Sequence, residues 1–85
     1  MVGFYEAVVT TSDGVYRAYP VSDDRVCVFE DGVAGIADYI NLNELDEALR
    51  APEYLVQLLI WWVYEHARGL QIETAVLRWR GQSAQ

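Results

Sequence analysis

The fold of this chain is decided by one apolar stretch, YLVQLLIWWVYEHARG at residues 54–69. Ten of its first eleven residues are aliphatic or aromatic. Pro52 suits the first turn of a helix and Gly69 is a natural terminator, so the sequence predicts a helix from Pro52 to Arg68. A membrane span needs about 20 apolar residues. This run has roughly half that number and Gln57 interrupts it, so we expect a helix buried in protein and no membrane partner.

The predicted helix has two different apolar faces, because each residue advances by about 100° around the axis. The inner face, which we expect to pack on a sheet, consists of Leu55, Val56, Leu58, Leu59, Trp62 and Val63. The outer face is the expected partner-binding or dimer surface, and it consists of Tyr54, Gln57, Trp61, Tyr64 and Arg68. The neighbours Trp61 and Trp62 therefore belong to opposite faces. The alternative is that Trp61 and Tyr64 pack beneath a short helix or a loop of the same chain.

Outside this helix, most of the chain is rich in residues that favour β-strands. The sequence predicts strands over 4–10, 15–21, 25–30 and 33–41, and a last strand over 71–80. Asp-Gly pairs at 13–14 and 31–32 favour tight turns. Pro20 cannot donate a ladder hydrogen bond, which indicates an edge or the end of the second strand. Asn43 can cap a short helix over 43–50.

These elements follow the order ββββ-α-α-β, which is typical of an α+β fold. We expect an antiparallel meander sheet of four to five strands, with a short and a long helix packed on one face. The whole forms a single domain over residues 1–80, followed by a frayed tail over 81–85.

The charge of the chain is strongly negative and unevenly placed. The net charge is −7, there is no lysine, and residues 1–50 hold ten acids against three arginines. An acidic field repels phosphate, so we expect no direct nucleic-acid binding and a basic protein partner instead. The expected acidic partner-binding surface consists of Asp23, Asp24, Glu30, Asp31, Glu44, Asp46 and Glu47. The alternative is that these acids only keep a small domain soluble.

Catalytic and metal-binding signals are weak in this sequence. His66 is the only histidine and Cys27 the only cysteine, so neither a disulfide framework nor a usual zinc set can be built. His66 is expected to be a packed residue near a helix C-terminus, and Cys27 a small buried hydrophobe. No phosphate-binding glycine loop or nucleophile elbow is present, so we expect no cofactor, no metal and no catalytic residue. The N-terminus does not read as a signal peptide, which favours a cytoplasmic location.

Together these features favour a small, acidic, non-enzymatic protein-binding module, an inhibitor or adaptor that occupies a basic, nucleic-acid-binding surface of its partner. Its profile is similar in type to small phage-encoded inhibitors of bacterial defence, such as anti-CRISPR proteins, which are also tiny, acidic and poor in motifs. Two alternatives stay open. One is a homo-oligomeric structural subunit, such as a homodimer, that associates through the aromatic helix face. The other is a small enzyme that uses His66 with Cys27 or a carboxylate.

Overall fold

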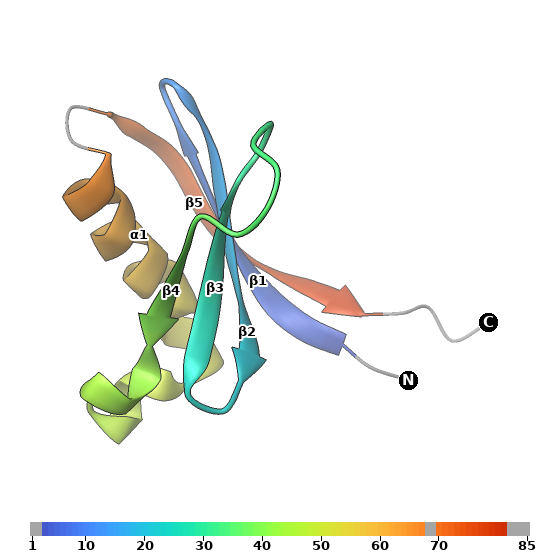
Figure 1. Ribbon diagram of the computed structural model, residues 1–85, viewed down its shortest axis with the longest axis vertical. Coiled ribbons are helices and arrows are strands. Elements are labelled where there is room, and N and C mark those ends of the chain that lie inside the picture. The colour runs from blue at the N-terminus through green and yellow to red at the C-terminus, as the bar shows by residue number, and fades with distance from the viewer. Residues whose placement is uncertain (1–2, 68–69, 82–85) are drawn as a thin grey trace.

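The computed structural model describes residues 3–67 and 70–81, and for residues 49–50 the backbone only. Five strands form one antiparallel sheet in the order β4-β3-β2-β1-β5 (Figure 1). The strands are β1 (Gly3–Thr11), β2 (Gly14–Ser22), β3 (Arg25–Glu30), β4 (Asp38–Asn41) and β5 (Ile72–Gly81). The one α-helix found in these residues, α1 (Leu55–His66), packs across one face of the sheet. The predicted α+β class, the antiparallel sheet and the position of the long helix are therefore confirmed.

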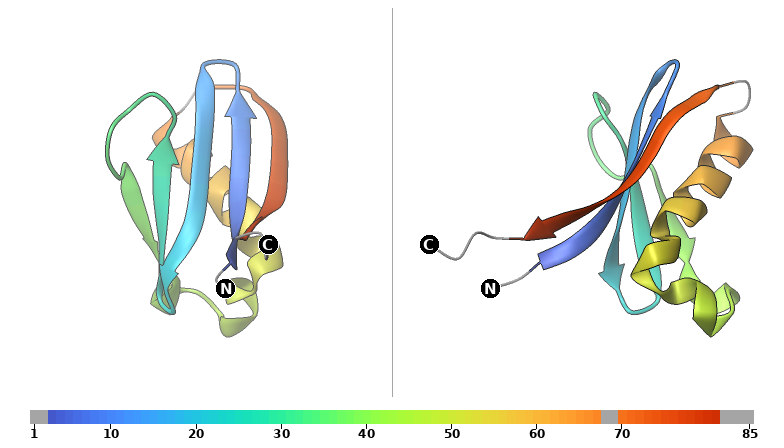
Figure 2. Two further views of the ribbon diagram at one scale, coloured as in Figure 1. Left: turned by 90° about the vertical axis from the view of Figure 1, so that its right-hand side faces the viewer. Right: turned by 180° about the vertical axis from the view of Figure 1, so that it is seen from behind.

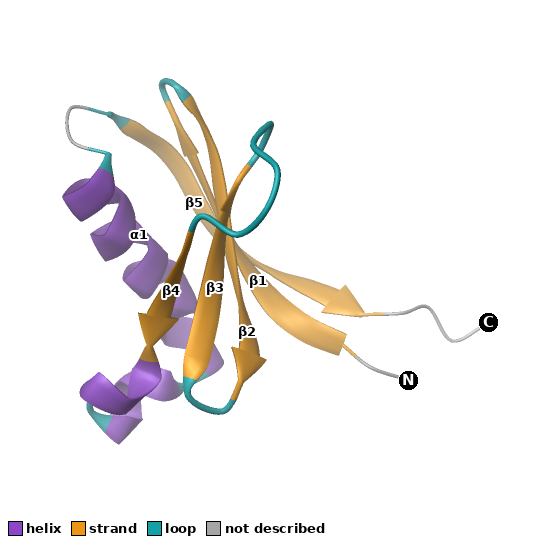
Figure 3. Cartoon of the chain, viewed as in Figure 1, coloured by secondary structure: helices purple, strands orange, loops and turns teal. Residues whose placement is uncertain are grey.

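The predicted short helix over 43–50 is wrong. The segment between β4 and α1 forms three short 3₁₀ turns instead, at Leu42–Glu44, Glu47–Arg50 and Pro52–Tyr54 (Figure 3). Asn41 rather than Asn43 provides the cap, since its side chain accepts a hydrogen bond from the Asn43 amide at 3.0 Å. The backbone is extended at Leu45 and again at Ala51, whose position before a proline disfavours the helical region. These interruptions leave no room for a regular helical turn to propagate.

The bounds of three predicted elements also need correction. The fourth strand covers only Asp38–Asn41, because residues 31–37 form a loop in which Gly32 and Gly35 adopt positive φ angles of 88° and 86°. The long helix covers Leu55–His66 rather than Pro52 to Arg68, since Ala67 is its C-cap, and Arg68 itself lies outside the described residues. Gly81, expected in the frayed tail, pairs with Gly3 in the ladder, while residues 82–85 lie outside the described part.

The core lies between α1 and the covered face of the sheet. Strand residues with the same parity point to one face, and on the covered face these are Ala7, Val9, Tyr16, Ala18, Val26 and Val28. The helix contributes Leu55, Leu58, Leu59 and Val63, each no more than 5% exposed. Ala7 and Ala18 are fully buried, and their small side chains allow the helix to approach the sheet closely.

No helix of the described residues lies on the other face of the sheet. Figure 2 shows this open face toward the viewer on the left, with α1 behind the sheet and β4 and β5 at its two edges. Its side chains include an aromatic row across three strands, in which Tyr19 lies between Phe4 at 4.9 Å and Phe29 at 5.2 Å, measured between ring centroids. The two faces of the sheet therefore offer separate surfaces.

Candidate functional site

The outer face of α1 is exposed, as the helical rotation predicts. Trp61, Tyr64 and Tyr54 are 46%, 58% and 39% exposed, and Gln57 between them is also exposed. We call these four residues the aromatic helix face; Arg68, predicted to belong to it, lies outside the described residues. The alternative that Trp61 and Tyr64 pack beneath another part of the same chain is wrong for the part that the structure describes. Three exposed aromatic rings, two on α1 and one on the 3₁₀ turn that leads into it, can anchor a partner surface.

A shallow apolar groove runs beside this face. It encloses about 250 Å³ between α1 and the segment around β4, and it is lined by Ile40, Leu45, Leu58, Trp61, Trp62 and Glu65. Trp61 forms one wall, while Glu65 is the only carboxylate among the lining residues. A partner side chain that enters here meets an apolar floor and an acidic rim.

A second hollow, of about 270 Å³, opens where the sheet twists away from the start of α1. Phe4, Tyr5, Leu55 and Trp79 are among its lining residues, and none of the lining residues is charged. Such a hollow can hold an uncharged apolar group, but its lining offers no charged side chain to orient a substrate.

The predicted acidic surface is divided between the two ends of the sheet. Asp23 and Asp24 lie in the β2–β3 turn. The 3₁₀ segment that carries Glu44, Asp46 and Glu47 lies beside this turn, at one end of the molecule (Figure 1). The Asp24 carbonyl accepts a hydrogen bond from the Leu42 amide at 2.7 Å, and an Asp24 carboxylate oxygen lies 3.3 Å from the Asn43 side-chain nitrogen. We name this group the acidic end; it consists of Asp23, Asp24, Glu44, Asp46 and Glu47.

The remaining two predicted acids, Glu30 and Asp31, lie at the opposite end of β3. Asp31 receives a two-pronged contact from Arg17, with its oxygens 2.8 and 3.1 Å from the guanidinium nitrogens. This hydrogen bonding lowers the pKa of Asp31 and raises that of Arg17. Asp31 is thus part of an ion pair within the chain. No residue of the acidic end forms an ion pair with a described side chain.

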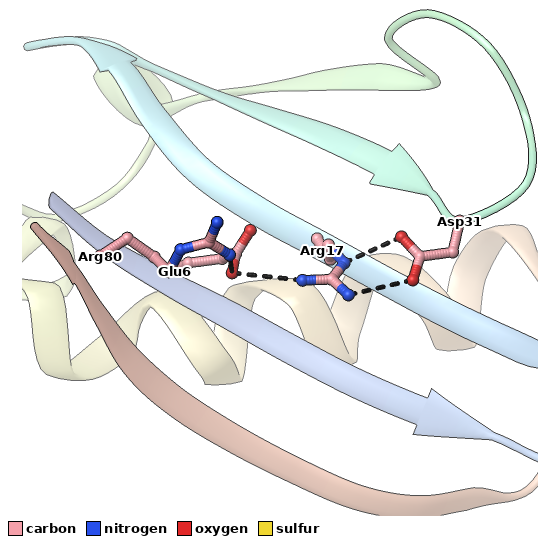
Figure 4. Close-up of polar contacts among 4 residues, drawn as sticks. All are labelled: Glu6, Arg17, Asp31 and Arg80. Atoms are coloured by element: carbon pink, nitrogen blue, oxygen red, sulfur yellow. Dashed lines mark hydrogen bonds and ion pairs between the residues drawn. The ribbon is translucent and has the colours of Figure 1, made fainter.

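Sequence reasoning missed a charged network on the open face of the sheet. Figure 4 shows Glu6 between two arginines: Arg80 lies 2.9 Å from its carboxylate and Arg17 lies 3.5 Å from the same oxygen. The Glu6 side chain is only 5% exposed, so these cations replace the water that a carboxylate needs. The β1–β2 hairpin register brings Arg17 toward Glu6, whereas Arg80 arrives through the pairing of β5 with β1.

His66 belongs to a different cluster, on the helix side of the sheet. Its ring stacks on Trp62 with centroids 4.5 Å apart and an interplanar angle of 10°. The Trp62 indole nitrogen donates a hydrogen bond of 2.7 Å to Asp38, whose same oxygen lies 3.5 Å from His66 Nε2. The cluster ties the end of α1 to the start of β4.

The structure does not bring His66 and Cys27 together. Cys27 pairs with Tyr19 on the face of the sheet away from α1, and its sulfur contacts the Tyr19 carbonyl oxygen at 3.5 Å. Burial raises the pKa of the Cys27 thiol, which favours its protonated, unreactive form. The sheet therefore separates the two residues that a Cys–His pair requires.

The Asp38 contact makes a prediction about pH. The Trp62 hydrogen bond, the Tyr39 amide and the His66 charge lower the pKa of Asp38 below its ordinary value of 3.8. A carboxyl whose folded pKa is depressed stabilises the fold fully above its unfolded pKa, and this stabilisation is lost as the pH falls through the folded value. We expect an NMR titration to give a higher Asp38 pKa in Trp62→Phe, which keeps an aromatic ring but lacks the indole donor. Equal values in both proteins would assign the shift to another contact.

Comparisons with protein-family models, with curated proteins and with solved structures found no match. Among the described residues, no group of three or more histidine, cysteine, aspartate or glutamate side chains lies close enough to hold a metal ion. Within the same residues, no helix has the length and apolar character required to cross a membrane. The surfaces described above are therefore the observations from which function is inferred.

Proposed function

We propose that this protein is a small non-enzymatic protein-binding module, an inhibitor or adaptor that occupies a basic surface of its partner, of the kind that otherwise holds nucleic acid. The observation that carries the proposal is the aromatic helix face, where three large rings stand exposed beside an apolar groove. Exposed tryptophan and tyrosine side chains are typical of the energetic centre of protein interfaces.

The surroundings of this face support a basic partner. Glu65 lines the groove, and Leu45, another lining residue, stands between Glu44 and Asp46 of the acidic end. The aromatic helix face thus has carboxylates on its rim that no described arginine neutralises. Rim charges steer association and select the sign of the partner, whereas aromatic anchors supply most of the affinity. We place the contact surface at the aromatic helix face together with the acidic end.

The anchor is tested by comparing two aromatic substitutions. We expect Trp61→Ala to weaken binding of the partner by about 2 kcal/mol, which is roughly thirtyfold, and to leave the fold intact. Tyr39→Ala is the matched control, because Tyr39 is 48% exposed but lies on the other face of the sheet. The partner is first identified by affinity capture with the unaltered protein and mass spectrometry, and the affinities are then measured with both purified. If Trp61→Ala binds as tightly as Tyr39→Ala, the aromatic helix face is not the anchor.

The charge of the rim is tested through the association rate. Glu47→Lys at the acidic end and Asp13→Lys in the β1–β2 turn raise the net charge equally, and both residues are exposed. We expect Glu47→Lys to slow association with the partner several-fold at low salt and the difference to shrink at high salt, because exposed charges are screened. Equal slowing by both variants would mean that the association rate depends only on the overall charge of the chain. The acidic end would then not be part of the contact surface.

A further inference from the structure

The outer edge of β5 is long and uncovered. β5 is the last strand of the sheet, and no other described strand pairs with its outer side. It has ten residues, whereas β4 at the opposite edge has four. Proteins usually protect an edge by shortening it, by covering it, by a β-bulge, or by placing charged side chains or proline on it. β5 contains no lysine or proline, its register irregularity is confined to the start of the strand opposite Thr10 and Thr11, and its residues from Val76 to Gly81 are exposed. Its outward backbone groups are therefore available to another strand.

The exposed side chains of β5 are also apolar on both faces of the sheet. Val76 is 44% exposed on the open face, and Leu77 and Trp79 are 37% and 55% exposed on the covered face, where neither belongs to the core cluster. The Trp79 ring lies over Gly3 of the neighbouring strand β1 and contacts Tyr5 edge-on, with ring centroids 4.9 Å apart. Because the ring leans toward β1, it leaves the outer edge of β5 free.

The charges along β5 are complementary to those of a second β5 that runs in the opposite direction. Glu73 lies near the start of the strand, and Arg78 and Arg80 lie near its end. An antiparallel pair brings the end of each strand that carries Glu73 beside the arginine-bearing end of the other, and it keeps the arginines of the two copies apart. A parallel pair in register places each arginine beside the same arginine of the second chain, which is unfavourable because like charges on neighbouring strands repel. The edge is therefore self-complementary in one direction only.

We propose that β5 is the pairing edge for a second copy of this chain: two β5 strands pair antiparallel about a two-fold axis at Val76, and the two sheets become one continuous sheet. A two-fold axis perpendicular to the sheet keeps each face on its own side, so residues of the same face stand opposite one another. With the axis at Val76, Thr74 lies opposite Arg78 and Ala75 opposite Leu77. With the axis at Arg78, the Arg78 side chains of the two copies would stand opposite each other, and their like charges would repel.

Pairing of this kind satisfies the outward backbone groups and covers the apolar side chains at the same time. In a continuous sheet, the outward N–H and C=O groups on both sides of Val76 gain partners, and Leu77 is covered by the second copy. The helices of the two copies lie on the same side of the joined sheet. The aromatic helix face takes no part, so this dimer and the partner contact proposed above are separate properties of the molecule.

The test is the mass in solution as a function of concentration. The chain has a mass of 9.7 kDa, and sedimentation is expected to show a concentration-dependent rise toward twice that value. Val76→Lys places two lysines opposite each other at the axis, and we expect the dimer dissociation constant to rise by at least about tenfold. Val33→Lys is the matched control, since Val33 is 55% exposed in the β3–β4 loop, away from β5. Circular dichroism checks that both variants remain folded.

A second measurement reports on the edge itself. Hydrogen exchange of the outward β5 amides should slow as the protein concentration rises, whereas exchange in the β3–β4 loop should not change. The proposal is overturned if the mass stays at 9.7 kDa at every concentration, or if Val76→Lys and Val33→Lys associate equally well. It is also overturned if Trp61→Ala dissociates the dimer and Val76→Lys does not, since the second copy would then sit on α1.

Discussion

Replacing Trp62 with alanine is expected to lower the free energy of unfolding by about 3 kcal/mol, at the low end of the range for large-to-small core changes. The ring packs against the core and lies 5.7 Å from the Tyr16 ring, centroid to centroid. Its indole also donates the hydrogen bond to Asp38. The ring is only partly buried, which limits the loss. A domain of this size has about 5–10 kcal/mol of stability in total, so the variant should melt at a much lower urea concentration.

Trp61→Ala is the control, because it removes the same side chain from the adjacent position. Trp61 is 46% exposed and contributes nothing to the buried core, so we expect a change in stability within about 0.5 kcal/mol. Urea melts of both variants decide the matter. If Trp61→Ala is as unstable as Trp62→Ala, the outer side of α1 is part of the protein's interior, and the proposed partner surface is lost with it.

The second large effect is expected in the network around Glu6. The double variant Arg17→Ala, Arg80→Ala removes both cations from a carboxylate that is 5% exposed, and should lower the free energy of unfolding by about 2–4 kcal/mol. This expected loss is smaller than the loss on breaking a fully buried ion pair. Arg17 and Arg80 are 30% and 48% exposed, so water can replace part of the solvation that they give the Glu6 carboxylate. The main cause is the desolvated Glu6 carboxylate that remains. Arg17→Ala also frees Asp31, but the Asp31 side chain is 45% exposed and water can solvate it.

This cause separates the network from ordinary surface charge pairs. Adding Glu6→Leu to the double variant removes the stranded carboxylate, and we expect it to restore at least half of the lost stability, since an apolar residue fits a buried site. Arg78→Ala is the control: Arg78 stands opposite Glu6 in the ladder but forms no ion pair with a described side chain, so we expect a loss of less than about 1 kcal/mol. If the triple variant is less stable than the double variant, the carboxylate itself is not the source of the loss.

Much of the fold was predictable from the sequence because it depends on local patterns. The alternation of side chains and the Asp-Gly turns located the first three strands, and the helical period separated Trp61 from Trp62. These signals extend over a few residues and need no knowledge of distant contacts. The segment over 43–50 was not predictable in this way. Its composition is typical of a helix, but extended residues at Leu45 and Ala51 divide it into 3₁₀ turns. Helix propensity is weak for so short a segment, and the contact of Leu42 with the β2–β3 turn overrides it.

By itself, then, the sequence determined the class of the fold, the rotation of α1 and the acidic character of the chain, since each depends on composition or on a short repeat. Only the tertiary structure decided which charges meet. It divided the predicted acidic residues between two ends, because the β2–β3 turn and the β3–β4 loop lie at opposite ends of β3. It placed Glu6 beside Arg80, 74 positions away, because β5 returns to pair with β1. It also left β5 at an open edge. Such pairings are set by the order of strands in the sheet, and that order is fixed by burial of the whole core rather than by any local pattern.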